Sequence, residues 1–143
     1  MSAKQLSVFI ENRQGRLDDV LSVLSKNGVN ILSVSLADTT EYGILRLIVG
    51  EPEKGRDMLA KAGFSPVLTD VLIIKVEHKT GSLQKIMSVI ASKNISIEYM
   101  YGLSVGGEQA SIVLKTSQLS EAEKLLKENK IDFMTADDLK KLQ

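Results

Sequence analysis

Apolar and polar positions alternate along this chain with two periods that follow one another in a fixed order. The apolar positions of residues 6–10 recur at every second residue, the period of a half-buried strand. Those of residues 17–24 recur at helical spacing, and Asn27-Gly28 is a typical helix stop. The pattern further predicts strands over 29–37 and 44–49, a turn over 38–41, a helix from Pro52 to Gly63, and a strand or extended link over 64–70. The first half therefore reads strand, helix, strand, strand, helix, strand.

The second half repeats this order, and the two halves match residue by residue. Gly81 follows Gly15 by 66 positions, and at the same offset Val8 matches Ile74. The chain is thus an internal duplication, with repeat 1 over residues 1–69 and repeat 2 over residues 70–143. In repeat 2 we expect strands over 72–76, 95–101, 110–115 and 131–134, helices over 83–90 and 120–129, a turn at Gly106-Gly107 and a short final helix through Gln143.

This order predicts an α+β fold class: two ferredoxin-like βαββαβ repeats side by side, each with an antiparallel sheet and its helices on one face. The first and third strands of a repeat then lie in the centre and the other two at the edges. Pairing of matching edges would extend one sheet across both repeats, with all four helices on one side. Phe9, Ile44, Ile48, Ile73 and the tyrosines would lie on or near the opposite face. Because a large exposed apolar patch marks an interaction site, we expect a homo-oligomer, most simply a homodimer.

Composition removes several classes of function. Lys and Arg together number 18, as do Asp and Glu, and a neutral chain is a poor nucleic-acid partner. The absence of cysteine excludes disulfides, thiolate nucleophiles and cysteine metal sites. His78 is the only histidine and has no clustered acids at ligand spacing, so we expect neither a metal nor another cofactor. No apolar run approaches the ~20 residues of a membrane span, and no signal-peptide core follows the first residues, so we expect a soluble cytoplasmic protein.

Two glycine segments carry the most specific signal. In each repeat a strand ends in an acid, a polar residue follows, and the pattern x-x-Gly-x-Leu opens a helix; repeat 1 then continues with Gly28-Val29-Asn30-Ile31. On a βαββαβ repeat this pattern resembles the ACT domain, in two copies that span nearly the whole chain. It looks most like the small stand-alone tandem ACT proteins. The resemblance implies a regulatory protein that binds an amino acid or similar small ligand at the seam between paired ACT domains.

The resemblance also implies which residues meet the ligand. By position, Asn12 makes the side-chain contact after the first strand, Gly15 lets the backbone approach, and Asn30 is the second amide contact. In repeat 2, His78 replaces the first amide and Ser96 replaces Asn30. We therefore expect the site around Asn12 and Asn30 to be the competent one, and its counterpart in repeat 2 to be weaker or to differ in specificity. The residues expected at the ligand are Glu11, Asn12, Gln14, Gly15, Arg16, Leu17, Asn30, Ile31, His78, Gly81, Ser82, Leu83 and Ser96.

The chemistry of these residues agrees with such a ligand. An amide supplies both a donor and an acceptor to a zwitterion without carrying charge into a buried seam. A glycine turn at a helix start is favourable to anions, and Arg13 and Arg16 flank the first one. Each residue also has a structural interpretation. Asn12 and Asn30 suit turns, Gly15 suits a positive φ, and the arginines and Lys79 suit solvent.

The sequence is compatible, to different degrees, with four functions. The first is the amino-acid-binding regulatory protein, and the alternative is a structural or partner-regulating subunit whose ligand site is vestigial. An enzyme is disfavoured because the chain has no cysteine, one histidine, no phosphate-binding loop and no acid pair at metal spacing. An RNA-binding module of the same order needs paired aromatic residues and basic character, whereas Phe9 stands alone and the net charge is zero.

Overall fold

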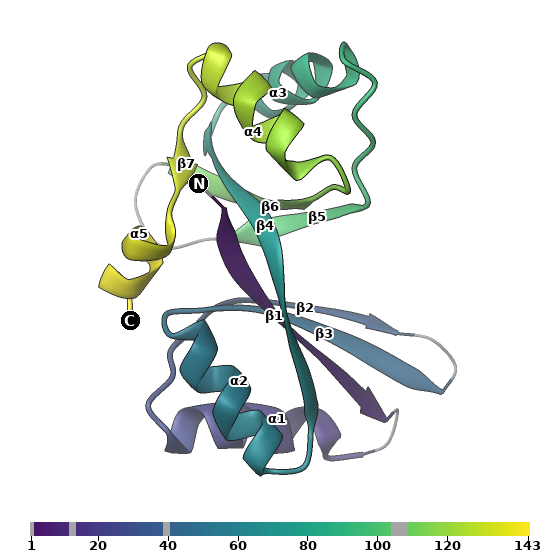
Figure 1. Ribbon diagram of the computed structural model, residues 1–143, viewed down its shortest axis with the longest axis vertical. Helices are drawn as coiled ribbons and strands as arrows, with labels where there is room; N and C mark the ends of the chain where they lie inside the picture. Colours follow the sequence, from purple (N-terminus) through teal and green to yellow (C-terminus); the bar gives the residue numbers. More distant parts are fainter. Residues whose placement is uncertain (1, 12–13, 39–40, 104–108) are drawn as a thin grey trace. The chain divides into compact units, whose positions relative to one another are not determined.

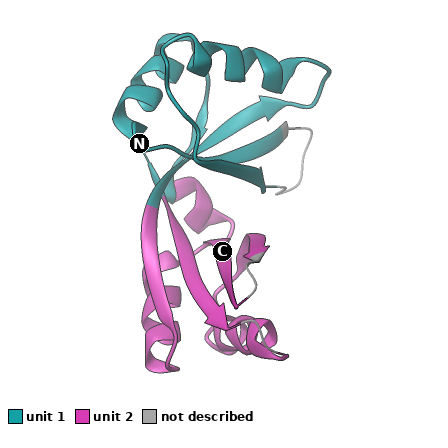
Figure 2. Cartoon of the chain, turned by 90° about the vertical axis from the view of Figure 1, so that its right-hand side faces the viewer, with its two compact units in different colours: residues 1–3, 70–136 teal, residues 4–69, 137–143 magenta. Residues whose placement is uncertain are grey.

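The computed structural model describes residues 2–11, 14–38, 41–103 and 109–143 (Figure 1). These residues form two compact units, and each unit takes a short segment from the other end of the chain (Figure 2). The amino-terminal unit, magenta in Figure 2, comprises residues 4–69 and 137–143. The carboxy-terminal unit, teal, comprises residues 70–136 with Ser2 and Ala3. The division into repeats at residues 69 and 70 stays a prediction about the duplication.

The amino-terminal unit is an antiparallel sheet with two helices on one face (Figure 1). Its strands are hydrogen-bonded in the order β2-β3-β1-β4, with Leu6 opposite Leu47 on the neighbouring strands β1 and β3. The fully buried Val8 and Leu45 pack against Leu24 and other apolar residues of the helices. The elements are β1 (Ala3–Glu11), α1 (Arg16–Lys26), β2 (Ile31–Asp38), β3 (Tyr42–Val49), α2 (Pro52–Lys61) and β4 (Ser65–Glu77).

Helix α1 shows how local sequence sets the bounds of an element. It begins after Gly15, carries Asp18 and Asp19 in its first turn where the helix dipole favours carboxylates, and buries Val20 and Leu24 on one face. It ends at Asn27, whose side-chain Nδ2 donates to the Val23 carbonyl at 2.8 Å. The predicted helix stop is confirmed.

The carboxy-terminal unit has the same design. Its strands are hydrogen-bonded in the order β5-β6-β4-β7, with Ile74 opposite Ile112 on β4 and β6. Ile86 and Ile90 of one helix and Leu126 of the other fill the core. Its further elements are α3 (Ser82–Ala91), β5 (Tyr99–Leu103), β6 (Gln109–Lys115), α4 (Leu119–Glu128) and β7 (Phe133–Met134). The predicted α+β fold class of two ferredoxin-like βαββαβ repeats is thereby confirmed.

Strand β4 corrects one prediction. The sequence suggested a strand or link over 64–70 and a separate strand over 72–76, whereas β4 runs unbroken from Ser65 to Glu77 and belongs to both sheets. No glycine or turn pair interrupts this stretch, and Pro66 lies at its second position, where a missing N–H is tolerated. Val71 to Ile74 are four consecutive buried residues, so here the strand is covered on both faces. The expected pairing of one repeat's edge with the other stays a prediction.

Two further differences concern bounds. β5 begins at Tyr99 rather than at Ile95, because Asn94 adopts a left-handed conformation with φ 56° and the Ser96 carbonyl accepts a hydrogen bond from the Thr116 hydroxyl at 2.7 Å. The predicted turn at Gly106-Gly107, and the middle of the one predicted over 38–41, lie outside the described residues.

The end of the chain forms a short helix, α5 (Ala136–Lys141), as predicted. Its residues from Asp137 onward belong to the amino-terminal unit rather than to the sheet that precedes them in sequence. Leu139 is only 2% exposed and anchors the helix. The polar sequence of α5 gives little indication of this destination.

Candidate functional site

The two glycine turns have the same backbone conformation. Gly15 has φ 88° and ψ −13°, and Gly81 has φ 86° and ψ −8°, both in the left-handed region that favours glycine. A Cβ added to either would meet nothing within 4 Å, so the conformation rather than crowding requires glycine. Each turn leads directly into a helix with no side-chain cap, which leaves backbone N–H groups at the helix start.

Around Gly15, the predicted site residues have different surroundings. The guanidinium of Arg16 lies 4.4 Å from the centre of the Phe64 ring and forms an ion pair with Asp19 at 3.3 Å. Arg16 therefore has two partners within its own unit, while its Nε is buried without a hydrogen-bond partner among the described residues. Leu17 packs against the core, while Glu11 and Gln14 are exposed. Asn12 and Arg13 lie outside the described residues.

Around Gly81, the structure brings two predicted site residues to one hollow of about 450 Å³, here called the turn pocket. His78 and Leu83 line it, as do the apolar side chains of Ala110 and Ile112 on β6. At its edge, Lys79 forms an ion pair with Glu77 at 2.9 Å. Both side chains are exposed, and the hydrogen bond and charge of Lys79 lower the pKa of the Glu77 carboxyl. Ser82, the next residue after Gly81, faces a different hollow.

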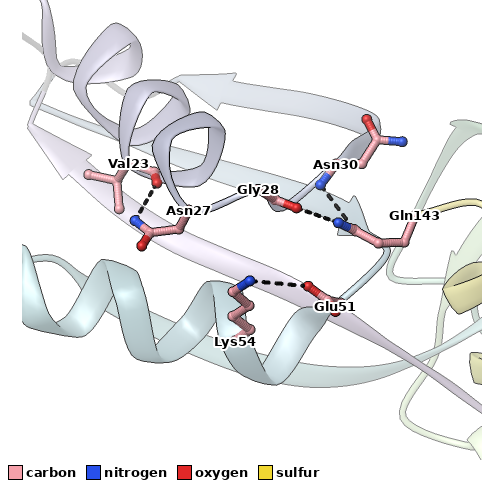
Figure 3. Close-up of polar contacts among 7 residues, drawn as sticks. All are labelled: Val23, Asn27, Gly28, Asn30, Glu51, Lys54 and Gln143. Carbon is pink, nitrogen blue, oxygen red and sulfur yellow. Dashed lines mark hydrogen bonds and ion pairs between the residues drawn. The ribbon is translucent and has the colours of Figure 1, made fainter.

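Asn30 has partners that the sequence did not reveal. Its backbone N–H donates to Oε1 of Gln143 at 3.0 Å, and its side-chain Nδ2 donates to the Leu142 carbonyl at 3.0 Å. Gln143 in turn donates through Nε2 to the Gly28 carbonyl (Figure 3). The last two residues thus clasp the α1–β2 turn, and we call them the C-terminal clasp. The residues that these hydrogen bonds join are more than 100 positions apart, so no local pattern in the sequence predicts the contact.

Gly15 and Asn30 lie at opposite ends of α1. Eleven helical residues span about 16 Å, so one amino acid cannot touch both within one unit. Ile31 packs against the core, and Ser96, the counterpart of Asn30 in repeat 2, is exposed and lies outside the turn pocket. The structure therefore gathers His78 and Leu83 and leaves Asn30 and Ser96 elsewhere.

The described residues offer neither a metal-binding cluster nor a membrane-spanning helix. No group of three or more His, Cys, Asp or Glu side chains there is arranged to hold a metal ion. Among the same residues, no helix has the length and apolar character needed to cross a membrane.

Comparisons with known proteins agree on the fold. The crystal structure of a protein from Bacteroides thetaiotaomicron is 37% identical, with a TM-score of 0.93, over 99% of this chain and 97% of that one. The regulatory subunit of aspartate kinase from Thermus thermophilus has a TM-score of 0.61 at 15% identity, over 87% of this chain and 91% of that one. The regulatory subunit of aspartate kinase from Thermus flavus has a TM-score of 0.60 at 16% identity, over 89% of this chain and 90% of that one. No curated protein matches the sequence. A family model described as an ACT domain pair matches residues 1–143, and the chain therefore belongs to the ACT domain pair family.

Proposed function

We propose that this chain is a non-catalytic regulatory protein that binds an amino acid, and that the turn pocket forms part of its binding site. The observation that carries the proposal is the match of the ACT domain pair model to residues 1–143. The fold it shares with aspartate kinase regulatory subunits supports a regulatory role.

The turn pocket has groups suited to a zwitterion. The start of α3 and the ammonium of Lys79 favour a carboxylate, and the carboxylate of Glu77 is an acceptor for an ammonium group. Leu83 and Ile112 supply apolar wall for a side chain. Such a pocket, mostly apolar with a few convergent polar groups, is typical of small-molecule sites.

We further propose that the ligand binds at the seam between two paired ACT domains. ACT resemblance places the ligand between paired domains, with one domain giving the glycine turn and the other the Asn30 position. The separation of Gly15 and Asn30 along α1 is consistent with that arrangement, because two domains must then contribute.

The alternative, a partner-regulating subunit with a vestigial ligand site, is favoured by one observation. Arg16 and Asn30, both expected at the ligand, already have partners within the chain. Under this alternative, repeat 1 has lost its site, and the protein acts through contacts with another protein.

Calorimetric titration of the full chain with each common amino acid tests the proposal. We expect one of them to bind, and His78→Ala and Lys79→Ala to weaken that binding about tenfold when combined. Lys61→Ala, an exposed lysine at the end of α2, is the control and should leave binding unchanged. Absence of binding for every amino acid at millimolar concentration would favour the vestigial alternative.

A further inference from the structure

The carboxy-terminal unit holds a second hollow, of about 390 Å³, with basic walls. We call it the lysine pocket, because the side chains of Lys75, Lys79, Lys85 and Lys130 all line it. It lies between the end of β4, the start of α3 and the turn before β7. It shares Glu77, Lys79 and Thr80 with the turn pocket, and its other walls are different.

The charges in the lysine pocket do not balance. Four lysines face two carboxylates, those of Glu77 and Asp132, and Glu77 is already paired with Lys79. Among the described residues, Lys75, Lys85 and Lys130 form no ion pair. The helix that opens at this pocket adds to the excess, because the first turn of α3 contains no acid.

The amino-terminal unit carries different side chains at the same place. There Arg16 lies over the Phe64 ring and forms an ion pair with Asp19, so its charge has a partner within the chain. By the repeat offsets of 66 and 67, the corresponding residues of the carboxy-terminal unit are Ser82, Ile131 and Lys85. The carboxy-terminal unit therefore lacks both the arginine–aspartate ion pair and the aromatic ring beneath it, and has a serine, a lysine and an isoleucine in their place.

Two details describe the backbone and side chains at this place. Oγ of Ser82 is buried and has no hydrogen-bond partner among the described residues, and the same is true of Nε of Arg16 at the matching position of the other unit. Lys130 is held at φ 58°, a strained conformation for a lysine, where the amino-terminal unit has Gly63 at φ 93°. A conformation of this kind persists where the surrounding structure holds it, and here it fixes the backbone of Lys130 at the wall of the pocket.

We propose that the lysine pocket is a binding site for a small dianion, carrying two carboxylates or a phosphate group. Lys85 and Lys130 come from opposite walls, α3 and the turn after α4, and together provide two cationic donors for separate oxygens. The start of α3 adds its dipole. The site shares Glu77, Lys79 and Thr80 with the turn pocket. Lys85 and Lys130, however, line the lysine pocket alone, so substitutions at these two positions test it separately from the amino-acid site.

Calorimetry on the full chain at low salt tests the proposal with two probes, succinate and inorganic phosphate. We expect at least one of them to bind, and the tighter one to identify the chemistry. Lys85→Gln and Lys130→Gly should each weaken binding about fivefold, which corresponds to about 1 kcal/mol. Lys130→Gly restores the glycine of the other repeat, so its thermal midpoint should be unchanged or higher, and lost binding cannot then be ascribed to misfolding.

Lys93→Gln is the matched control, because Lys93 is an exposed lysine near the other end of α3 that does not line the pocket. It should leave binding unchanged. Failure of both probes to bind at tens of millimolar would overturn the proposal. So would equal losses in all three variants, since binding would then follow net charge rather than this pocket.

Discussion

Gly50, at the end of β3, provides a sharp test of the C-terminal clasp. The residue is buried, its φ does not lie in the left-handed region, and a Cβ added to it would come within 2.9 Å of the Gln143 Cα. Gly50→Ala therefore forces the clasp to move while the backbone of β3 tolerates alanine. Three exposed hydrogen bonds join the clasp to the α1–β2 turn, each worth about 0.5 kcal/mol at the low end of the usual range. Their loss predicts a fall of about 1.5 kcal/mol in the free energy of unfolding.

A truncated background separates the clasp from other effects of the substitution. In a chain ending at Lys141, Gly50→Ala should cost no more than about 0.5 kcal/mol, because the atoms it would strike are gone. Leu139 is still present there, so α5 stays docked. The full chain and the truncated chain, each with and without Gly50→Ala, form a double-mutant cycle. Urea unfolding followed by circular dichroism measures the free energy of unfolding of all four proteins, and we expect a coupling energy of about 1 kcal/mol. Gly102→Ala, whose Cβ would meet nothing within 4 Å, is the control. An equal cost of Gly50→Ala in both backgrounds would refute the reasoning.

Three further predictions concern association, binding and charge. Phe9 is 56% exposed on its sheet, so we expect light scattering to report a homo-oligomer that Phe9→Asp weakens, and a monomer across the micromolar range would contradict this. If Asn30 contacts the amino acid, Asn30→Ala should weaken calorimetric binding about tenfold or more and Ser96→Ala should change it little; equal losses would argue against unequal sites. Lys79→Met should raise the midpoint of the Glu77 carboxyl titration followed by NMR, because Lys79 is the main cause of its lowered pKa; an unchanged midpoint would show that the ion pair does not persist in solution.

Features set by local sequence could be predicted. Alternation at Leu6, Val8 and Ile10 gave β1, since those side chains all lie on the helix-covered face of the sheet. The equivalence of Gly15 and Gly81 followed from the repeat, and the two residues share one conformation. Such features depend on residues a few positions apart, so a pattern in the sequence is sufficient to reveal them.

Features set by distant contacts could not be predicted. The path of the C-terminal clasp depends on Asn30 and Gln143, 113 positions apart. Ile48 and Ile73 were expected to leave apolar surface on the open face, and that expectation was wrong: both are fully buried, and neither belongs to the two helix-covered cores. Alternation shows that a side chain points away from the helices, but not whether another segment of the chain covers it.

The duplication gives a physical reason to expect unequal functions in the two repeats. A repeat that keeps its fold must keep its core positions and its glycine turn, and both units do. Differences in charge between the units gather where α1 or α3 begins. In one unit Arg16 forms an ion pair with Asp19 and lies over Phe64. In the other, Lys85 and Lys130 replace Asp19 and Gly63, which adds two positive charges that form no ion pair among the described residues. Because a cluster of like charges is unfavourable by itself, an anion from outside the chain would lower its free energy, and for this reason we expect the anion to bind the second repeat rather than the first.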